Sequence, residues 1–507
     1  MYRLMLYLVA GWSGCFVMAL ELLGGRLLAP YFGSSIYVWG AIITVFMLAL
    51  SVGYLLGGHW SRRNPSLRRL CLLLWVAAAS AAPIMLSGEA LLDGLSTRIT
   101  DPRAGSLGAA LLLFALPTVV SGMVSPYAVR LLVADRHSAG LDAGRLYFVS
   151  TFGSAAGTLL TSFYLVLYFE VNQILWAMAL ISAGIGALGV LRRPLAAAAL
   201  LACVPLCMPP HAQAAGTGTG TGAAAGAGHA ESAALRLVHS ERSLYRQVLI
   251  YEGEGTRCLC FTRMCTIGRQ SCMNLAQPDQ LVFQYTHMML GALLLNPEPH
   301  DVLIIGLGGG SLPRALSTLL PQAQIDLVEI DPAVVRVAGE YFSFHATEHL
   351  HVHTEDGRAF VRRSAHGTQR YDLIMLDAYD HQYIPEHMLT QEFLQEVRSL
   401  LRPGAVLAAN TFSNSHLYDN ESVTYARVFG EFYNLRRGNR VILTRLGGLP
   451  AADALRANAE RLGGAFQPLG FSPTQLLELY SRQVDWKSGA RVLTDQYSPA
   501  NLLNAAP

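Results

Sequence analysis

The stretch VLIIGLGGGSLPRALSTLLPQAQIDLVEID, residues 302–331, decides the fold of the second half of this chain. An apolar strand leads into a glycine-rich turn and a helix, and a second apolar strand ends in Glu329, about twenty residues beyond the glycines. This order is typical of a nucleoside-binding α/β unit, in which glycines let the backbone approach the ligand and the acid accepts hydrogen bonds from ribose hydroxyls. We therefore expect Gly306, Gly308 and Glu329 to bind a nucleoside.

The composition divides the chain into an apolar first part and a more polar second part. Of its 507 residues, 52% are hydrophobic and 14% are charged, and the mean hydropathy is +0.34. These values are too apolar for an ordinary soluble enzyme, and the excess lies in about the first two hundred residues. The formal net charge of +2 gives no reason to expect nucleic acid as a partner.

Six apolar runs in the first part are each close to the roughly 20 residues needed to cross a bilayer. They cover 4–24, 36–58, 70–88, 107–129, 147–169 and 171–191. Arginines gather in alternate loops, within 62–69, 130–145 and 192–193, and the intervening loops carry Glu89, Asp93, Asp101 and Glu170. By the positive-inside rule, the N-terminus and the arginine-rich loops are cytoplasmic. The sequence thus predicts a multi-pass protein of the cell (inner) membrane, with the lipid bilayer as a partner.

A seventh apolar run at 195–208 is short, rich in alanine and interrupted by Pro205. If this run crosses the bilayer, the rest of the chain is extracytoplasmic; if it lies in the interface, the rest is cytoplasmic. Together with the arginines before it and the small residues at 211–214, it also resembles a secretory signal. We expect a membrane domain of six or seven helices over 1–208, a flexible linker over 209–233 and a soluble domain over 234–507.

Two features of the membrane domain have a structural and a functional interpretation. The pairs Gly53/Gly57 and Gly153/Gly157 place small residues on one helix face, which favours close helix packing. Glu21 lies deep in the first apolar run, where a carboxylate is costly and is usually paired or functional. We interpret Glu21 as a polar contact within the bundle, and a transport site is the alternative.

The soluble domain is expected to hold a β subdomain over 234–280, a Rossmann-like core over 281–445 and an extension over 446–507. The core alternates between strand and helix patterns, which predicts a doubly wound sheet. Its expected strands are 302–306, 325–329, 350–353, 371–376 and 405–410. Its expected helices are 280–295, 312–320, 332–341, 356–364 and 390–401. The fold class is therefore a multi-pass helical membrane domain joined to an α/β, methyltransferase-type domain.

Acidic residues follow the ends of several expected strands, at the edge where doubly wound sheets bind ligands. Asp377 and Asp380 come directly after one strand, and two such carboxylates can hold a cationic amine and accept its proton. Turn or cap aspartates are common at the same place. Asp356, followed by Gly357, can bond an adenine amino group, cap the next helix, or do both.

Two further groups of residues receive a structural interpretation. Tyr285 and His287 lie on an apolar helix and are interpreted as core or rim residues. Four cysteines, Cys258, Cys260, Cys265 and Cys272, form a cluster whose spacing matches no paired zinc pattern. A β-hairpin register explains the cluster as well as a metal site does, and we expect no metal. Disulfides are not expected if the domain is cytosolic.

At these residues the chain resembles the spermidine synthase (polyamine aminopropyltransferase) family, in its membrane-fused bacterial form. The resemblance covers about residues 240–445. It rests on Ser243–Gln247, the glycine turn, Val328–Asp331, Glu355–Arg358, Tyr371-Asp372, Asp377–Asp380, Phe393 and Leu401–Gly404, and the tail Leu493–Pro499 is similar to the end of membrane-fused members.

The resemblance implies transfer of an aminopropyl group from decarboxylated S-adenosylmethionine, a co-substrate, to putrescine, without a cofactor or metal. The products would be spermidine and methylthioadenosine. Carried over by position, Asp377 would accept the proton and Asp380 would anchor the amine. Gln247, Glu329, Asp356 and Gly357 would hold the nucleoside. Because adenosyl sulfonium substrates are made in the cytosol, we expect a cytoplasmic soluble domain, and the family suggests a homodimer.

Two departures from the family pattern leave alternatives open. Soluble members carry an aspartate in the glycine turn that holds the donor's amine, but this chain has Gly309. They also carry Tyr-His-Glu where this chain has Tyr285-Thr286-His287. One alternative is a methyltransferase or lyase that uses intact S-adenosylmethionine. Another is a polyamine transporter or sensor whose soluble domain only binds a nucleoside.

Overall fold

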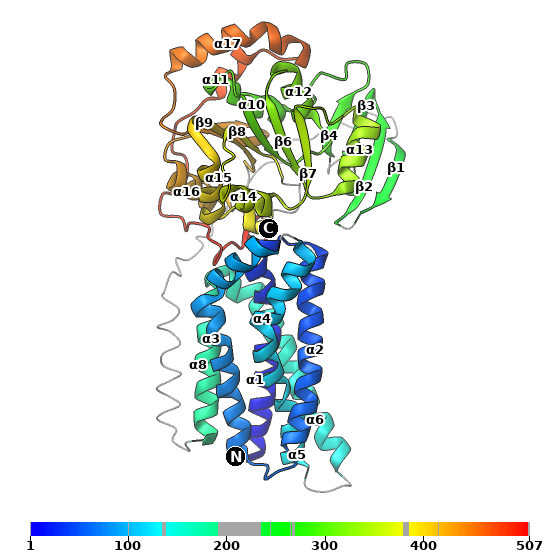
Figure 1. The fold of residues 1–507 in the computed structure, drawn as a ribbon, viewed down its shortest axis with the longest axis vertical. Helices are drawn as coiled ribbons and strands as arrows, with labels where there is room; N and C mark the ends of the chain where they lie inside the picture. Colours follow the sequence, from blue (N-terminus) through cyan, green and yellow to red (C-terminus); the bar gives the residue numbers. More distant parts are fainter. Residues whose placement is uncertain are drawn as a thin grey trace, which may run out of the picture. The chain divides into compact units, whose positions relative to one another are not determined.

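The computed structural model describes residues 2–99, 101–133, 138–190, 235–243, 245–263, 265, 269–378, 385–413 and 415–504. The chain divides into two compact units (Figure 1). Unit 1 comprises Met1–Gly216 together with Asp495–Pro499, and unit 2 comprises Thr217–Thr494 together with Ala500–Pro507. The finer domain boundaries expected from the sequence stay a prediction.

Unit 1 is a bundle of long apolar helices (Figure 1). Its helices are α1 (Tyr2–Phe32), α2 (Ile36–Trp60), α3 (Leu67–Arg98), α4 (Pro102–Gly122), α5 (Val124–Leu132), α6 (Ala139–Leu160), α7 (Val166–Tyr168) and α8 (Val171–Val190). A π-helical turn, η1 (Thr161–Leu165), joins α6 to α7. Six helical segments among the described residues are long and apolar enough to cross a membrane. These candidate spans coincide with the six apolar runs of the sequence.

Glycines bring two pairs of these helices into close contact. A Cβ atom on Gly53 of α2 would collide with the carbonyl oxygen of Val119 on α4. A Cβ atom on Gly153 of α6 would collide with the backbone of Gly11 on α1. Larger side chains at these glycines would push the helices apart. The predicted packing role of the glycines is therefore confirmed.

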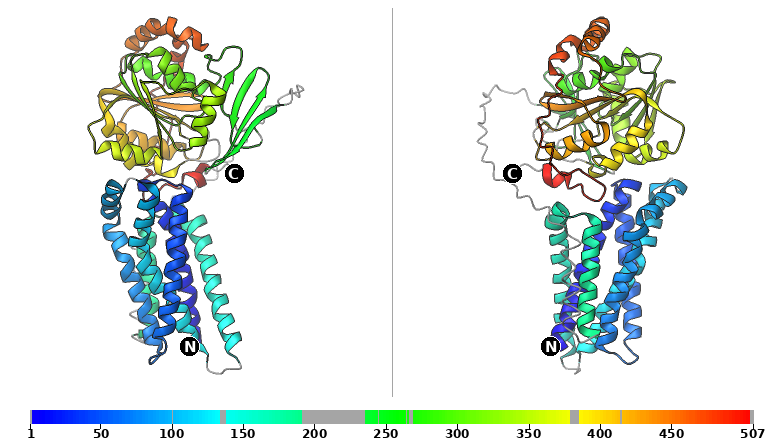
Figure 2. Two further views of the ribbon diagram at one scale, coloured as in Figure 1. Left: turned by 45° about the vertical axis from the view of Figure 1, so that its right-hand side comes forward. Right: turned by 90° about the vertical axis from the view of Figure 1, so that its left-hand side faces the viewer.

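Unit 2 begins with a four-stranded antiparallel sheet. Its strands are β1 (Arg236–Arg242), β2 (Gln247–Gly253), β3 (Thr256–Cys260) and β4 (Arg269–Asn274), in the spatial order β1-β2-β3-β4. Figure 2 shows these green strands beside the larger sheet of the same unit. The strand-rich character expected for this segment is observed.

The larger sheet of unit 2 has seven strands in the order β10-β11-β9-β8-β5-β6-β7. These are β5 (Asp301–Ile305), β6 (Gln324–Glu329), β7 (Leu350–Thr354), β8 (Tyr371–Leu376), β9 (Leu401–Thr411), β10 (Tyr433–Arg437) and β11 (Asn439–Arg445). Strands β5 to β9 pair in parallel, whereas β11 lies antiparallel between β9 and β10. This arrangement is the methyltransferase-type Rossmann fold, so the expected α/β architecture is confirmed.

Helices cover both faces of the seven-stranded sheet, because its central strands carry apolar side chains on both faces. On β5, Val302 and Ile304 pack in one apolar cluster and Leu303 and Ile305 in another. The first cluster includes α10 (Gln284–Leu290), α11 (Ala292–Leu295), α12 (Ser311–Leu319), α13 (Pro332–Phe342) and α17 (Ala452–Phe466). The second includes α14 (Gly357–Ala365), α15 (Gln391–Leu400) and α16 (Tyr418–Phe429). The shorter helices are η3 (Glu386–Met388), η4 (Gln467–Leu469), α18 (Pro473–Leu476), η5 (Leu477–Leu479) and α19 (Ala500–Asn504).

The sequence located all five parallel strands but missed the last two strands of the sheet. Strands β10 and β11 form a hairpin whose turn residue, Gly438, has a φ of 75°. Residues on both strands are buried in consecutive runs rather than in alternation, with the apolar run Val441–Leu443 just after this glycine. Exposed arginines at the hairpin end, such as Arg437, interrupt the apolar pattern of these strands.

Candidate active site

The glycine turn lies between the ends of β5 and β8 and the start of α12. Gly306, Gly308 and Gly310 have φ values of 104°, 54° and 79°, a backbone region that favours glycine. A Cβ atom on Gly306 would also collide with the carbonyl group of Asp377. The turn therefore needs glycine both for its conformation and for its close contact with the end of β8.

Glu329 ends β6 and fixes the glycine turn through its carboxylate. Oε2 accepts a hydrogen bond of 3.0 Å from the N–H of Leu307, and Oε1 accepts one of 3.0 Å from the N–H of Asp331. Burial raises the pKa of Glu329, and these two backbone hydrogen bonds oppose the increase. The charge of Arg246 also lowers this pKa, which makes Arg246 an additional residue near the turn. The carboxylate is thus held where the sequence predicts ribose binding.

The β subdomain contacts the core directly beside Glu329. Ser243 donates a hydrogen bond of 2.5 Å from its hydroxyl to Oδ2 of Asp331. Asp331 is buried, and its Oδ1 accepts from the N–H of Ala333 at the start of α13. Gln247 begins β2, and its amide donates to the hydroxyl of Ser240 at 3.3 Å. The predicted nucleoside contact of Gln247 stays a prediction.

Asp377 follows β8 and is held by two polar side chains. Its Oδ1 accepts a hydrogen bond of 2.9 Å from Nδ2 of Asn410 on β9, and its carboxylate also accepts from the hydroxyl of Tyr285. Burial raises the pKa of Asp377 to about 7, although both hydrogen bonds oppose the increase. A carboxyl group with this pKa is suited to exchange protons near neutral pH.

Tyr285 and Asn410 were not predicted as site residues. Tyr285, on α10, packs against the apolar core as expected, and its hydroxyl also donates a hydrogen bond to Asp377. His287 does pack in the core, where its ring stacks on Phe471 with centroids 4.1 Å apart. A polar aromatic side chain near the start of the expected helix 280–295 was a signal for Tyr285. Nothing in the sequence indicates that Asp377 and Asn410 are in contact.

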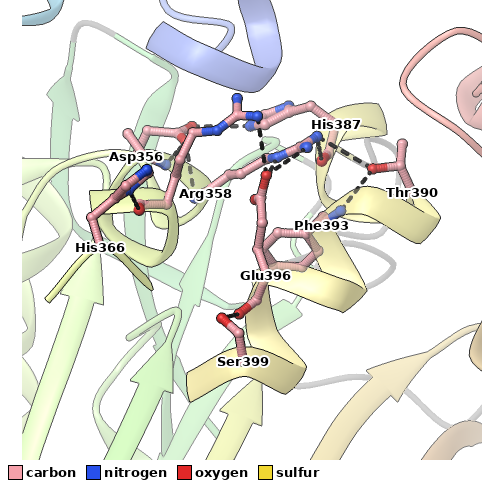
Figure 3. Close-up of polar contacts among 10 residues, drawn as sticks. Asp356, Arg358, His366, His387, Thr390, Phe393, Glu396 and Ser399 are labelled. Carbon is pink, nitrogen blue, oxygen red and sulfur yellow. Dashed lines mark hydrogen bonds and ion pairs between the residues drawn. The ribbon is translucent and has the colours of Figure 1, made fainter. Parts of the chain in front are cut away.

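Asp356 is buried at the start of α14, where it caps the helix (Figure 3). Its Oδ1 accepts from the N–H groups of Arg358 and Ala359 at 3.0 and 3.1 Å, and its Oδ2 lies 3.1 Å from Nε2 of His387. Burial raises the pKa of Asp356, but the charge and hydrogen bond of His387 and the two N–H groups outweigh it and lower the pKa. The helix-cap interpretation is confirmed, and the adenine contact stays a prediction.

Arg358 links α14 to the segment that carries His387 (Figure 3). Its side chain is fully buried, and its NH1 donates to the carbonyl oxygen of His387 at 2.7 Å. Its Nε and NH2 donate to the two carboxylate oxygens of Glu396 at 3.1 and 3.2 Å. This fork-like contact with Glu396 is the geometry in which arginine binds carboxylates most strongly. Arg358 therefore fixes the chain that presents His387 to Asp356.

The remaining predicted residues have different outcomes. A Cβ atom on Gly357 would lie 2.5 Å from Cγ2 of Ile305, so this glycine allows α14 to approach β5. Its proposed nucleoside contact stays a prediction. Asp380 lies outside the described residues. Gly309 is enclosed: a Cβ atom there would lie 2.8 Å from Oγ of Ser271 and 3.0 Å from Cδ1 of Phe342.

The four cysteines of the β subdomain form two disulfides, Cys258–Cys272 and Cys260–Cys265. Cys258 and Cys272 face each other in the paired strands β3 and β4. The hairpin register thus explains their positions, as one interpretation of the sequence held. Pairing as disulfides differs from what a cytosolic domain predicts.

Comparison with known proteins assigns the family of this second half. Residues 282–437 match the model of the spermine/spermidine synthase domain. A polyamine aminopropyltransferase of Vibrio vulnificus is 46% identical over 272 residues, which cover 53% of this chain and 91% of that protein. The chain belongs to the polyamine aminopropyltransferase family. A second member of the family, from Chromobacterium violaceum, is 31% identical over 204 residues, or 39% of this chain and 77% of that protein.

Other relatives extend beyond the aminopropyltransferases. The human eEF1A lysine and N-terminal methyltransferase is 38% identical over 133 residues, which cover 24% of this chain and 19% of that protein. The spermidine synthase of Thermotoga maritima aligns with a TM-score of 0.38 and 18% identity, over 48% of this chain and 84% of that structure.

Proposed function

We propose that this chain is a membrane-bound polyamine aminopropyltransferase that moves an aminopropyl group from decarboxylated S-adenosylmethionine to putrescine or a related diamine. Spermidine and methylthioadenosine are the products of this reaction. The environment of Asp377 carries the proposal. A carboxyl group with a pKa of about 7 lies against the backbone of Gly306, in the turn expected to bind the nucleoside.

In this reaction the neutral nitrogen of the amine attacks the aminopropyl carbon that is bonded to the sulfonium. A carbon–nitrogen bond forms, the carbon–sulfur bond breaks, and its electron pair returns to sulfur, which leaves in neutral methylthioadenosine. An ammonium group has no free electron pair, so the amine must lose a proton before it attacks. Asp377 accepts this proton, and a pKa near the working pH suits that role.

The other side chains of the site orient the reactants. Glu329 and the glycine turn, through Gly306 and Gly308, hold the nucleoside so that the amine and the carbon–sulfur bond lie in line. Such orientation can supply much of the rate acceleration of a two-substrate reaction. Tyr285 and Asn410 keep the Asp377 carboxylate directed at the amine.

Four further residues are assigned by the family resemblance. Gln247, Asp356 and Gly357 contact the nucleoside, and Asp380 anchors the far amine of the acceptor. Asp356 has three partners in the structure, so an adenine amino group must use a remaining lone pair of its carboxylate. The six apolar helices support anchoring in a lipid bilayer. A homodimer is proposed from the family alone.

A methyltransferase or lyase that uses intact S-adenosylmethionine is the second candidate. It is favoured by the enclosure of Gly309, because Ser271 and Phe342 occupy the space that an aspartate side chain would need. Because residue 309 is glycine, this turn lacks the acid that soluble family members use to hold the amine of the decarboxylated donor. The relative among lysine methyltransferases points in the same direction.

A donor comparison tests the two candidates. The detergent-purified full chain is incubated with putrescine and either decarboxylated or intact S-adenosylmethionine, and the products are followed by mass spectrometry. Spermidine and methylthioadenosine from the decarboxylated donor alone support the aminopropyltransferase. Turnover of the intact donor supports the second candidate. Nucleoside binding without turnover of either donor contradicts both and supports the sensor or transporter, for which Glu21 rather than Asp377 would be essential.

A further inference from the structure

The segment Asp495–Pro499 belongs to unit 1, although the residues on either side of it belong to unit 2. The N–H of Val171 donates to the carbonyl oxygen of Gln496 at 2.9 Å, and the N–H of Asn172 donates to Oε1 of Gln496 at 3.1 Å. The amide of Gln496 in turn donates to Oε1 of Glu89 at 3.1 Å. Backbone and side chain of Gln496 are therefore both bound by helix residues.

The residues that follow Gln496 are buried, and one of them contacts α1. Tyr497 and Ser498 are buried, with 7% and 5% of their surfaces exposed. The carbonyl oxygen of Ser498 accepts a hydrogen bond of 3.3 Å from NH1 of Arg26. Hydrogen bonds thus hold this segment to the helices of unit 1.

All of these contacts lie at one end of the helices. Arg26 is in the last two turns of α1, Glu89 is in the last third of α3, and Val171 begins α8. If the six candidate spans cross the bilayer in alternating directions, the end of the first span, the end of the third and the start of the sixth share one side of the membrane. The segment Asp495–Pro499 lies on that side.

The distribution of charge identifies this side as extracytoplasmic. Described arginines of unit 1 are concentrated at the opposite end: Arg3, Arg62, Arg63, Arg68, Arg69, Arg130 and Arg145. The end that binds the segment has Arg26, Arg98 and Arg103, together with Glu89, Asp93, Asp101 and Glu170. An excess of arginine marks the cytoplasmic side of a multi-pass protein. Gln496 and its neighbours are then on the other side.

The disulfides of unit 2 point to the same compartment independently. Cys258 and Cys272 are buried cross-strand partners whose Cα atoms are 4.1 Å apart, and Cys260 and Cys265 form a second buried pair. Disulfides form and persist outside the cytoplasm, where thiols are not kept reduced. Two disulfides in one small subdomain are unusual for a cytosolic enzyme.

We propose that unit 2, with the candidate active site, lies on the extracytoplasmic side of the membrane. The covalent bonds Thr494–Asp495 and Pro499–Ala500 tether it to the end of the helices that binds Asp495–Pro499. This replaces the expectation of a cytoplasmic domain, which rested on where the substrates are made. The proposal requires a seventh crossing before Leu235, and the apolar run 195–208, which lies outside the described residues, is the segment available for it.

The proposal goes beyond the enzymatic function and does not depend on it. It determines where the substrates must be present, since an extracytoplasmic site takes its amine from outside the cytoplasm. An adenosyl sulfonium donor would have to cross the membrane to reach this site. Any reaction of unit 2 that uses such a donor then requires an export step to supply it.

Cysteine labelling in intact spheroplasts tests the proposal with the full-length chain. Val484→Cys introduces a thiol at a residue of unit 2 that is 62% exposed. Pro65→Cys introduces one in the exposed, arginine-rich loop between α2 and α3. A membrane-impermeant maleimide should label the unit 2 variant before lysis and the loop variant only after lysis, with the unsubstituted chain as background. Labelling of the unit 2 variant only after lysis, or of the loop variant before it, would overturn the proposal.

Thiol counting on the unsubstituted chain supplies a second readout. Free thiols are blocked in denatured membranes, disulfides are reduced, and new thiols are labelled with a polyethylene glycol maleimide. We expect a gel shift for four cysteines, those of the two disulfides. If reduction adds no label, and all cysteines of the denatured chain react with the maleimide without reduction, the cysteines are free thiols. That outcome contradicts an oxidising location.

Discussion

Asn410 donates a hydrogen bond of 2.9 Å from Nδ2 to Oδ1 of Asp377, and its own Oδ1 accepts one of 3.2 Å from Nδ2 of Asn439. The second contact fixes the orientation of the Asn410 amide, so that its NH2 group faces the carboxylate. A hydrogen-bond donor stabilises the ionised form of a carboxyl group and lowers its pKa. Asn410 thus limits the increase in the pKa of Asp377 that burial causes.

The rate should depend on pH through Asp377. Burial raises its pKa to about 7, and proton acceptance requires the ionised form, so activity should fall as the pH drops below about 7 and level off above it. Replacing Asn410 by Leu removes a hydrogen bond that lowers this pKa and should move the rising limb to higher pH. The profile of kcat/KM against pH, which reports the pKa values of the free enzyme, measures both effects. Asn458→Ala, on α17, is the control and should leave the profile unchanged.

Removal of the proton acceptor should nearly abolish turnover. In Asp377→Asn the amide cannot accept a proton from the ammonium, and loss of a general base typically costs about 10²- to 10⁴-fold in rate. Steady-state kinetics with saturating diamine measure the loss. Asp453→Asn, whose carboxylate is 96% exposed on α17, is the matched control. Full turnover by Asp377→Asn would rule out its role as the base.

Glu329→Gln should weaken nucleoside binding. The carboxylate is the acceptor proposed for the ribose hydroxyls, and hydrogen bonds to charged groups contribute about 1.5–3 kcal/mol. The Kd for methylthioadenosine should therefore rise roughly 10- to 150-fold. Calorimetric titration of the purified chain gives this value directly. Glu340→Gln, at an exposed position of α13, should bind as tightly as the unsubstituted chain, and equal affinity for Glu329→Gln would exclude a ribose contact.

The sequence predicted those parts of the fold that depend on local pattern. The glycine turn, the acid at the end of β6 and the acid after β8 each follow an apolar strand, so strand ends alone indicate one ligand-binding edge. The partners of Asp377 could not be predicted in this way. Asn410 reaches Asp377 because β9 pairs with β8, and Tyr285 reaches it because α10 packs on the sheet.

The cysteines illustrate a second limit. A hairpin register is one of two interpretations of their spacing, and the pairing of Cys258 with Cys272 confirms it, whereas disulfides are not expected in a cytosolic domain. The expectation of a cytosolic domain depends on the presumed substrates and not on the residues themselves. Contacts of Gln496 with Glu89 and Val171, which bear on the compartment, join parts of the chain more than three hundred residues apart. No pattern within the sequence indicates such a contact.

A side chain at position 309 should destabilise unit 2. In Gly309→Ala the new Cβ would lie 2.8 Å from Oγ of Ser271 and 3.0 Å from Cδ1 of Phe342. Overpacking of this kind costs about 1–3 kcal/mol, or roughly 2–4 °C of Tm per kcal/mol in a domain of this size. Thermal unfolding measures the change. Ser271→Ala removes the nearest atom and should recover part of the loss, whereas Gly339→Ala, where the nearest atom is 3.4 Å away, should not lower Tm.

Arg358→Lys should destabilise unit 2 although it preserves the charge. Arg358 is fully buried and uses Nε and NH2 on Glu396 and NH1 on the carbonyl oxygen of His387. A lysine ammonium cannot reproduce this fork, so some buried acceptors lose their donor, and losses of this kind cost about 1–3 kcal/mol for each unpaired group.

The same substitution should also change the environment of Asp356. Release of the His387 carbonyl frees the segment that holds the His387 ring beside Asp356, and the pKa of Asp356 should rise because the charge of His387 lowers it in the structure. Thermal unfolding measures the stability, and a calorimetric titration with methylthioadenosine measures whether the adenine end of the site is disturbed. Arg363→Lys, whose side chain is 47% exposed and pairs with Glu355, is the matched control. Unchanged stability of Arg358→Lys would show that the fork with Glu396 contributes little to the fold.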